Sequence, residues 1–270
     1  MPIGVHTALV VFFMLFWATV SWVILFKTSY LKPKKAFSPL PPMTIWHLLG
    51  GFFVFFISFA AITPLLNFFL KISLGIHDGI GKEFVGLAVF CLSFFLYCFA
   101  IRKTLFPYFR ETGLLIGILS WLLIFPLIYI WAGAVDYFTQ HFLGYEPMEQ
   151  SAVLALKNNQ GNSTLFYSLI FMVILPIPAI EEILFRGFLQ NWIRLKLGIK
   201  PAILITALIF AFFHFSPSQG WSNLTIVSSL FFLGCFLGFL FEKTHSLRTS
   251  IGLHSTFNAM SVLFIFIKDA

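Results

Sequence analysis

Continuous apolar runs of roughly 20 residues recur along almost the whole chain, and this is the length that a helix needs to cross a lipid bilayer. Of the 270 residues, 59% are hydrophobic, 10% are charged and 38 are phenylalanine. A soluble domain of this size would expose more apolar surface than water tolerates. A membrane β-barrel fits poorly, because its strands alternate polar and apolar positions over about 10 residues.

The apolar runs, separated by charged or proline-rich breaks, predict an all-α, polytopic integral membrane protein with about eight transmembrane helices. The expected spans are 4–26, 43–70, 84–101, 113–135, 165–188, 201–215, 224–241 and 249–267. No polar stretch is long enough for a separate soluble domain, so residues 1–270 are predicted to form a single membrane domain. The longest polar stretch, 136–164, is expected on the outer side, with a short helix within 146–160.

Lysine and arginine residues alternate between the two sides of this layout. Short cytoplasmic loops carry an excess of these residues, so their distribution predicts the orientation. Twelve of the 17 basic residues fall on one side and four on the other, with Arg186 inside a span. The richer side holds Lys27, Lys32, Lys34, Lys35, Arg102, Lys103, Arg110, Arg194, Lys196, Lys200, Lys243 and Arg248. Both termini are therefore expected on the non-cytoplasmic side.

The formal net charge of +7 follows from this topology and from contact with membrane lipid, and no nucleic-acid partner is predicted. The three cysteines are Cys91, Cys98 and Cys235. All lie in apolar spans without a CxxC pair, so no disulfide framework is expected. Gly113 with Gly117, and Gly234 with Gly238, have the four-residue spacing that lets membrane helices approach closely.

Ionisable side chains are rare inside the predicted spans. Of the ten acids only Glu181 and Glu182 lie within one, whereas the others, Glu242 among them, sit in loops or at span edges. Of the seven histidines only His214 and His254 lie away from loops and span edges. The two glutamates, the two histidines and Arg186 all fall in the last 90 residues. An ionised side chain at membrane depth costs about 2.5 to 3.5 kcal/mol on insertion scales, so this set indicates a functional site.

Helical spacing separates the two adjacent glutamates. Residues four apart share a face of an α-helix, so Glu182 is expected to pair with Arg186 while Glu181 points elsewhere. The same spacing aims the imidazole of His254 and the carboxamide of Asn258 into one cavity. A carboxylate, imidazoles and an amide donor can activate water and stabilise an oxyanion, the chemistry of amide hydrolysis. The alternatives are a structural Glu182–Arg186 clamp and a helix-to-helix tie through Asn258.

Two further features bear on the geometry of this cavity. Pro176 and Pro178 remove backbone donors, so the glutamates are expected just after a distorted turn. Phe210 and His214 also have the four-residue helical spacing. Counted from the cytoplasmic ends of their spans, however, His254 lies at a depth of roughly 8 Å and His214 at roughly 20 Å. The two imidazoles are therefore not expected to meet unless the sixth span is tilted or a funnel joins the two depths.

Three motifs in this order resemble those of the CAAX prenyl protease and bacteriocin-processing (CPBP, Abi) family of intramembrane proteases. Residues 181–186, EEILFR, match the EExxxR motif, residues 210–214, FAFFH, match FxxxH, and residues 254–258, HSTFN, match HxxxN. The resemblance covers about residues 165–267, predicted to be the catalytic core, whereas the first four spans, within 1–135, have no assigned role.

The resemblance implies a role for each motif residue. Glu181 would be the general base, working with His214 on the attacking water, while His254 and Asn258 would stabilise the oxyanion. Glu182 would be a supporting residue, together with Arg186. Two histidines and a glutamate could also hold zinc, in which case Glu181, His214 and His254 would be the ligands. HExxH is absent, and the prediction favours a metal-free mechanism that requires no cofactor.

The predicted function is therefore intramembrane cleavage of a membrane-embedded or lipidated peptide. The first alternative is a non-proteolytic membrane scaffold or bacteriocin-immunity protein that retains the motifs. The second is a proton-coupled transporter, although the sequence shows no paired broken-helix repeats. The layout suits a bacterial cytoplasmic membrane, or the endoplasmic reticulum if the source is eukaryotic.

Overall fold

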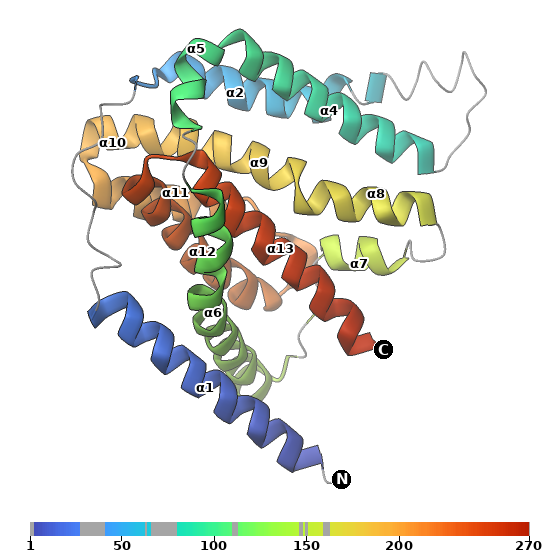
Figure 1. The fold of residues 1–270 in the computed structure, drawn as a ribbon. Helices are drawn as coiled ribbons and strands as arrows, with labels where there is room; N and C mark the ends of the chain where they lie inside the picture. Colours follow the sequence, from blue (N-terminus) through green and yellow to red (C-terminus); the bar gives the residue numbers. More distant parts are fainter. Residues whose placement is uncertain are drawn as a thin grey trace.

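A computed structural model of the chain describes residues 3–27, 41–62, 64–65, 80–109, 113–145, 148, 151–158 and 163–269. Within those ranges every regular element is helical, which confirms the predicted fold class (Figure 1). The first half contains α1 (Ile3–Lys27), α2 (Ile45–Ile57), η2 (Ser58–Ile62), α4 (Ile80–Ala100), α5 (Arg102–Leu105), η3 (Phe106–Tyr108) and α6 (Leu114–Leu143). The second half contains α7 (Ser151–Asn158), α8 (Ser163–Ile174), α9 (Pro176–Glu182), η4 (Ile183–Gln190), α10 (Asn191–Leu197), α11 (Ile199–Phe212), η5 (Pro217–Gln219), α12 (Ser222–Thr244) and α13 (Leu247–Asp269).

Fewer helices qualify as membrane spans than the sequence predicts. Among the described residues, the stretches long and apolar enough are Ile45–Ile62, Leu114–Leu143, Phe166–Leu197 and Ser222–Thr244. A fifth is added if Ala88–Ala100 and Arg102–Tyr108, which meet at 79°, form one bent span. Helices also occupy the other expected positions, but α11 has 14 residues. At 1.5 Å per residue it reaches only about 21 Å, short of a hydrocarbon core of about 30 Å.

Large apolar side chains cover the outward faces of these helices. Phe12, Trp46 and Phe142 are 70%, 76% and 71% exposed, and many other phenylalanines and leucines are exposed beside them. Soluble proteins rarely expose apolar patches of this extent, whereas lipid chains solvate them well. The chain is thus an integral membrane protein.

The two glycine pairs lie where helices approach closely, as predicted. A Cβ on Gly117 of α6 would stand 2.1 Å from the carbonyl oxygen of Thr249 in α13. A Cβ on Gly234 of α12 would stand 3.0 Å from Cα of Ala207 in α11. These positions allow backbones to pack in direct contact, which drives helix association in lipid.

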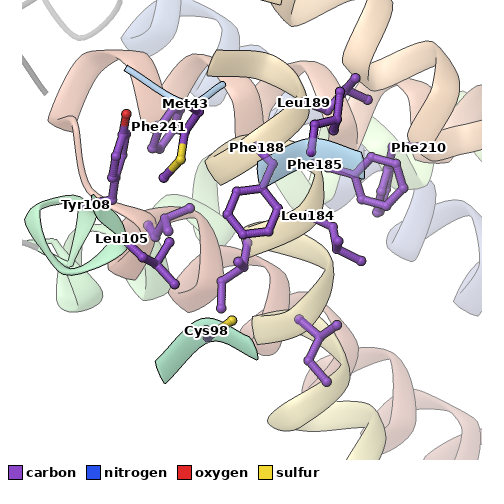
Figure 2. Packing of buried hydrophobic residues seen from close by; sticks show 14 of the residues in the cluster. Met43, Cys98, Leu105, Tyr108, Leu184, Phe185, Phe188, Leu189, Phe210 and Phe241 are labelled. Atoms are coloured by element: carbon purple, nitrogen blue, oxygen red, sulfur yellow. The ribbon is translucent and has the colours of Figure 1, made fainter. Parts of the chain in front are cut away.

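The N-terminal helices pack on the helix that carries the glutamates. Figure 1 shows α2 and α4 lying over α8 and α9, and a buried apolar cluster joins them to η4. At one end of this cluster the rings of Tyr108 and Phe241 are stacked 6.2 Å apart, and at the other Phe185 meets Phe210 edge-on at 5.2 Å (Figure 2). α2 and α4 therefore form one wall around η4.

Some predictions of loop structure fall on residues outside the described ranges. These are the positions of Lys32, Lys34, Lys35 and Arg110, the segment 66–70 of the second expected span, and both ends of the segment 146–160. A short helix does form within that segment, at Ser151–Asn158. All three cysteines are free, as expected.

Candidate active site

The two adjacent glutamates lie at the middle of the apolar stretch Phe166–Leu197. Glu181 follows Phe166 by 15 residues, and Glu182 precedes Leu197 by 15. The side chain of Glu182 is fully buried and that of Glu181 is 19% exposed. The structure thus places both carboxylates far from either end of an apolar helix.

The helix is broken just before the glutamates, which confirms the predicted distortion. α8 ends before Leu175, whose φ of −116° and ψ of −70° depart from helical values, and α9 begins with Pro176. Pro176 and Pro178 lack the N–H that would bond back across the break. After Glu182 the backbone continues as the π-helix η4 to Gln190. Such π-helical turns are rare and occur frequently at functional sites.

Arg186 pairs with Glu182, as the four-residue spacing predicts. Nη1 of Arg186 donates to Oε1 of Glu182 at 2.8 Å, and neither side chain is exposed. Nη2 donates to the carbonyl of Gly234 at 3.3 Å, and the guanidinium carbon lies 4.5 Å from the centroid of the Phe210 ring. The arginine therefore connects the glutamate helix to both α12 and α11.

His254 contacts both glutamates. Its Nδ1 lies 2.9 Å from Oε1 of Glu182, and its Nε2 lies 3.6 Å from Oε2 of Glu181. An ionised carboxylate is only an acceptor, so Nδ1 carries the proton and donates to Glu182. Sequence reasoning linked His254 to Glu181 alone. The bond to Glu182, which fixes the orientation of the imidazole, is a feature that it missed.

His214 lies in the turn after α11, and its ring still contacts that of Phe210, as the four-residue spacing predicts, with 4.9 Å between the ring centroids. α11 ends at Phe212, and the backbone N–H of His214 donates to the carbonyl of Ala211. The ring folds back so that Nδ1 lies 2.9 Å from the carbonyl oxygen of Phe210. A carbonyl can only accept, so Nδ1 carries the proton. Nε2 is left facing Glu181, whose Oε1 is 4.0 Å away.

The two imidazoles meet at one carboxylate, so they do converge, as the sequence left open for a tilted sixth span or a funnel. Nε2 of His214 and Nε2 of His254 lie 4.0 and 3.6 Å from the carboxylate of Glu181. Depth counted in residues assumes spans parallel to one axis. Figure 1 shows instead that α13 crosses α6 obliquely, so the number of residues from a helix end does not give depth.

Asn258 forms the helix-to-helix tie that the sequence offered as an alternative to an oxyanion role. Its Nδ2 donates to the carbonyl of Val173 at 2.9 Å, which ties α13 to α8 just before the proline break. Among the described residues no hydrogen bond joins Asn258 to Glu181 or His254. A carboxamide has two N–H groups, so one remains for a substrate.

The cluster is open on the side of His214. The side chain of His214 is 32% exposed, compared with 19% for Glu181 and 4% for His254. The Glu182–Arg186 pair lies behind them and is fully enclosed. The site thus has an open carboxylate–imidazole edge supported by a closed ionic layer.

Glu181, His214 and His254 are the three residues that the sequence offers as zinc ligands. Nδ1 of His214 and Nδ1 of His254 are occupied by Phe210 and Glu182, so only their Nε2 atoms face Glu181. Over the described ranges, no group of three or more His, Cys, Asp and Glu side chains is arranged to hold a metal ion. The choice between zinc and metal-free chemistry stays a prediction.

Neither of two cavities in the described part of the chain contains the cluster. One of about 520 Å³ touches Ile183, the residue after Glu182, and is lined by apolar side chains and Arg248. A larger one of about 650 Å³ lies between α1, α6, α11 and α12. The larger cavity is therefore not the place of the glutamate chemistry, whereas the smaller one adjoins the motif.

Sequence reasoning missed a polar network of Gln190, Arg194 and Glu242, which begins one helical turn after Arg186. Glu242 was placed at the edge of a span, but it is only 8% exposed and accepts from Gln190 at 3.0 Å and from Arg194 at 3.3 Å. Gln190 also donates to the carbonyl of Gly238 at 3.0 Å. The spacing of Arg186, Gln190 and Arg194, each four apart, is the signal that could have revealed it.

Comparison with known families agrees with this geometry. Residues 162–260 match a family model described as type II CAAX prenyl endopeptidase Rce1-like. The matched stretch contains all three motifs and every residue of the cluster. No curated protein and no solved structure matched the chain. The resemblance predicted from the motifs is confirmed over residues 162–260, which match the Rce1-like family model.

Proposed function

We propose that the chain is an intramembrane endopeptidase of the CAAX type that cleaves a peptide bond with water activated by Glu181. The family match supports the reaction class. The observation that carries the proposal is the carboxylate of Glu181 between two imidazole nitrogens, at 3.6 and 4.0 Å, on the accessible edge of a buried ionic pair. Distances beyond 3.5 Å leave a place for a bridging water between these groups.

In the proposed reaction the water lies between Oε1 of Glu181 and Nε2 of His214. Glu181 accepts one proton as the water oxygen bonds to the scissile carbonyl carbon. The carbonyl π-electrons move to oxygen and form a tetrahedral oxyanion. As this intermediate collapses, the C–N bond breaks and the proton held by Glu181 passes to the leaving nitrogen. Atoms and charge balance without a further reactant.

The remaining motif residues stabilise or position these groups. The second N–H of Asn258 is assigned to the oxyanion, where such donors contribute most. Nε2 of His254 joins it when the ring carries a second proton, since Nδ1 is already bonded to Glu182. Glu182 positions His254 through its bond to Nδ1, and Arg186 compensates the charge of Glu182. No metal is required in this scheme, because the base and the oxyanion donors are all side chains.

A membrane-embedded or lipidated peptide is the substrate class that we propose. The cavity of about 520 Å³ beside Ile183 supports it, because its lining is largely aromatic and aliphatic. The lining residues are Phe95, Cys98, Phe99, Leu105, Phe106, Phe109, Ile183 and Arg248. Residues 165–267 are assigned as the catalytic core, and the helices within 1–135 as a wall of this cavity.

For the membrane layout we propose that the helices at the eight expected positions cross in alternation, with α11 as a short crossing and both termini on the non-cytoplasmic side. The distribution of basic residues supports this orientation. The membrane is assigned as a bacterial cytoplasmic membrane, with the endoplasmic reticulum as its eukaryotic counterpart.

Membrane proteomics of the native chain and its Glu181→Gln variant tests the function. The substitution keeps the size of the side chain and removes the base. We expect uncut peptides to accumulate in the variant at unchanged abundance of the protein, which would also name the substrate. Asp136→Asn is the matched control, because this carboxylate accepts a hydrogen bond from Thr225 and lies in α6, outside the three motifs.

Two results would contradict the proposal. Identical peptide profiles with unchanged cellular function in Glu181→Gln would favour the scaffold or immunity alternative. Solute flux that depends on Glu181 in reconstituted vesicles, without any cleavage, would favour a transporter.

A further inference from the structure

An apolar groove lies away from the glutamates, on the face of the bundle formed by α1, α6, α11 and α12. Its volume is about 650 Å³, within the range of about 300 to 1,000 Å³ typical of small-molecule sites. Representative lining residues are Trp22, Ile128, Trp131, Leu204, Phe232 and Phe236. Such a lining suits a hydrocarbon chain.

One end of this groove is cationic. Lys200, in the first turn of α11, is the one charged residue among those that the structure describes in the lining. Phe239 lines the same end, and Nζ of Lys243 lies 5.8 Å from the centroid of its ring. Both lysines belong to the side of the chain that carries the excess of basic residues, where anionic lipid headgroups concentrate.

We propose that this groove binds an anionic phospholipid, with an acyl chain along the aromatic walls and the phosphate at Lys200 and Lys243. Basic pockets between membrane helices on the cytoplasmic side bind such headgroups. The site also adjoins the ionic layer of the motif, since Cys235 lines the groove and the preceding residue, Gly234, accepts from Arg186. The proposal does not depend on the proposed protease activity.

Binding can be measured with the purified full-length chain in detergent. Phosphatidylglycerol and phosphatidylcholine with brominated acyl chains quench tryptophan fluorescence on contact, and Trp22 and Trp131 line the groove. At about 1 kcal/mol for each lysine near an anionic headgroup, phosphatidylglycerol should bind about 25-fold more tightly than phosphatidylcholine. Lys200→Ala should reduce this preference about five-fold.

Two further variants separate the groove from the surface charge. Lys196→Ala removes an exposed lysine of α10 at the same end of the protein but outside the lining, and should leave the preference unchanged. Leu204→Phe narrows the groove without altering charge and should weaken binding of both lipids. Glu181→Gln should bind both lipids as the native chain does, whether or not the chain is a protease.

Equal affinity for the two lipids in the native chain would overturn the proposal, because it would indicate an annular lipid without headgroup recognition. An equal loss of the preference for phosphatidylglycerol in Lys196→Ala and Lys200→Ala would overturn it as well, because the attraction would then come from the whole basic surface.

Discussion

Arg186 offers a sharp test of the buried ionic layer, through the substitution Arg186→Met. The guanidinium is fully buried and bonds to Glu182 at 2.8 Å and to the carbonyl of Gly234 at 3.3 Å. Methionine keeps much of the apolar stem but leaves the carboxylate of Glu182 with His254 as its remaining partner. Breaking a buried pair from one side typically costs about 3 to 5 kcal/mol, because an uncompensated charge stays buried.

A second substitution separates charge from packing. In the double variant Glu182→Gln with Arg186→Met, the uncompensated charge is gone while the carboxamide oxygen still accepts from His254. Replacing both members of a buried pair is often close to neutral. The bond to Gly234 stays lost, at about 0.5 to 1.5 kcal/mol. The double variant should therefore regain most of the loss and remain about 1 kcal/mol below the native chain.

The assay is the free energy of unfolding in bicelles, measured by titration with a denaturing detergent. Arg194→Met is the matched control, because Arg194 is 20% exposed and its contact with Glu242 is longer, at 3.3 Å. A partly exposed pair is worth about 1 kcal/mol or less. The reasoning would be refuted if Arg186→Met cost no more than Arg194→Met, or if the double variant were less stable than Arg186→Met alone.

Three further predictions concern the role of Asn258, the contact between α6 and α13 at Gly117, and the dependence of cleavage on a metal. Asn258→Ala should lower kcat about 10²- to 10³-fold in single-turnover cleavage if it serves the oxyanion, and an unchanged kcat would limit it to the tie with Val173. Gly117→Ala should cost about 1 to 3 kcal/mol of unfolding free energy, because its Cβ would meet backbone 2.1 Å away. Gly133→Ala, in the same helix with nothing within 4 Å of the new Cβ, should cost little, and equal losses would contradict the packing argument. Thorough removal of metal from the purified chain should leave cleavage intact, whereas loss restored by zinc would overturn the metal-free mechanism.

Local chemistry made several of these features predictable from the sequence. Proline lacks an N–H, so Pro176 and Pro178 were expected to break the helix wherever it lay. The pairing of Glu182 with Arg186 followed from helical spacing, because both residues belong to one continuous segment. Continuous apolar runs located the helices, since backbone groups in lipid must bond within the segment.

Features that depend on how helices cross were not predictable in this way. The choice of His254 between Glu181 and Glu182 depends on the rotation of α13 against α9, and no spacing within one segment encodes it. A π-helix bonds each residue to the fifth along, so positions in η4 depart from the 100° rule used for the prediction. His214 reaches the same carboxylate from the turn after α11, which likewise depends on how separate helices pack.

The hydrogen bonds of the two histidines determine what the cluster around Glu181 must hold. Nδ1 of His214 donates to the carbonyl of Phe210, and Nδ1 of His254 donates to Glu182. Each neutral ring then turns the lone pair of Nε2 toward the carboxylate of Glu181. Three acceptors without a donor between them are unfavourable in a partly buried site, so a proton or a water must lie among them. A water held at this position would also be placed for activation by Glu181.

A donor placed at this position should therefore stabilise the fold while removing the base. In Glu181→Gln the carboxamide N–H groups can bond to Nε2 of His254 or of His214, which lie 3.6 and 4.0 Å from the native oxygens. We expect a Tm equal to or above that of the native chain, together with loss of cleavage, since catalytic groups are commonly held at a cost in stability. Glu182→Gln is the contrasting variant and should lower the Tm, because it leaves Arg186 buried without its counter-charge. If Glu181→Gln lowered the Tm as much as Glu182→Gln, Glu181 would be a structural member of the ionic layer, and the separation of one supporting glutamate from one catalytic glutamate would not hold.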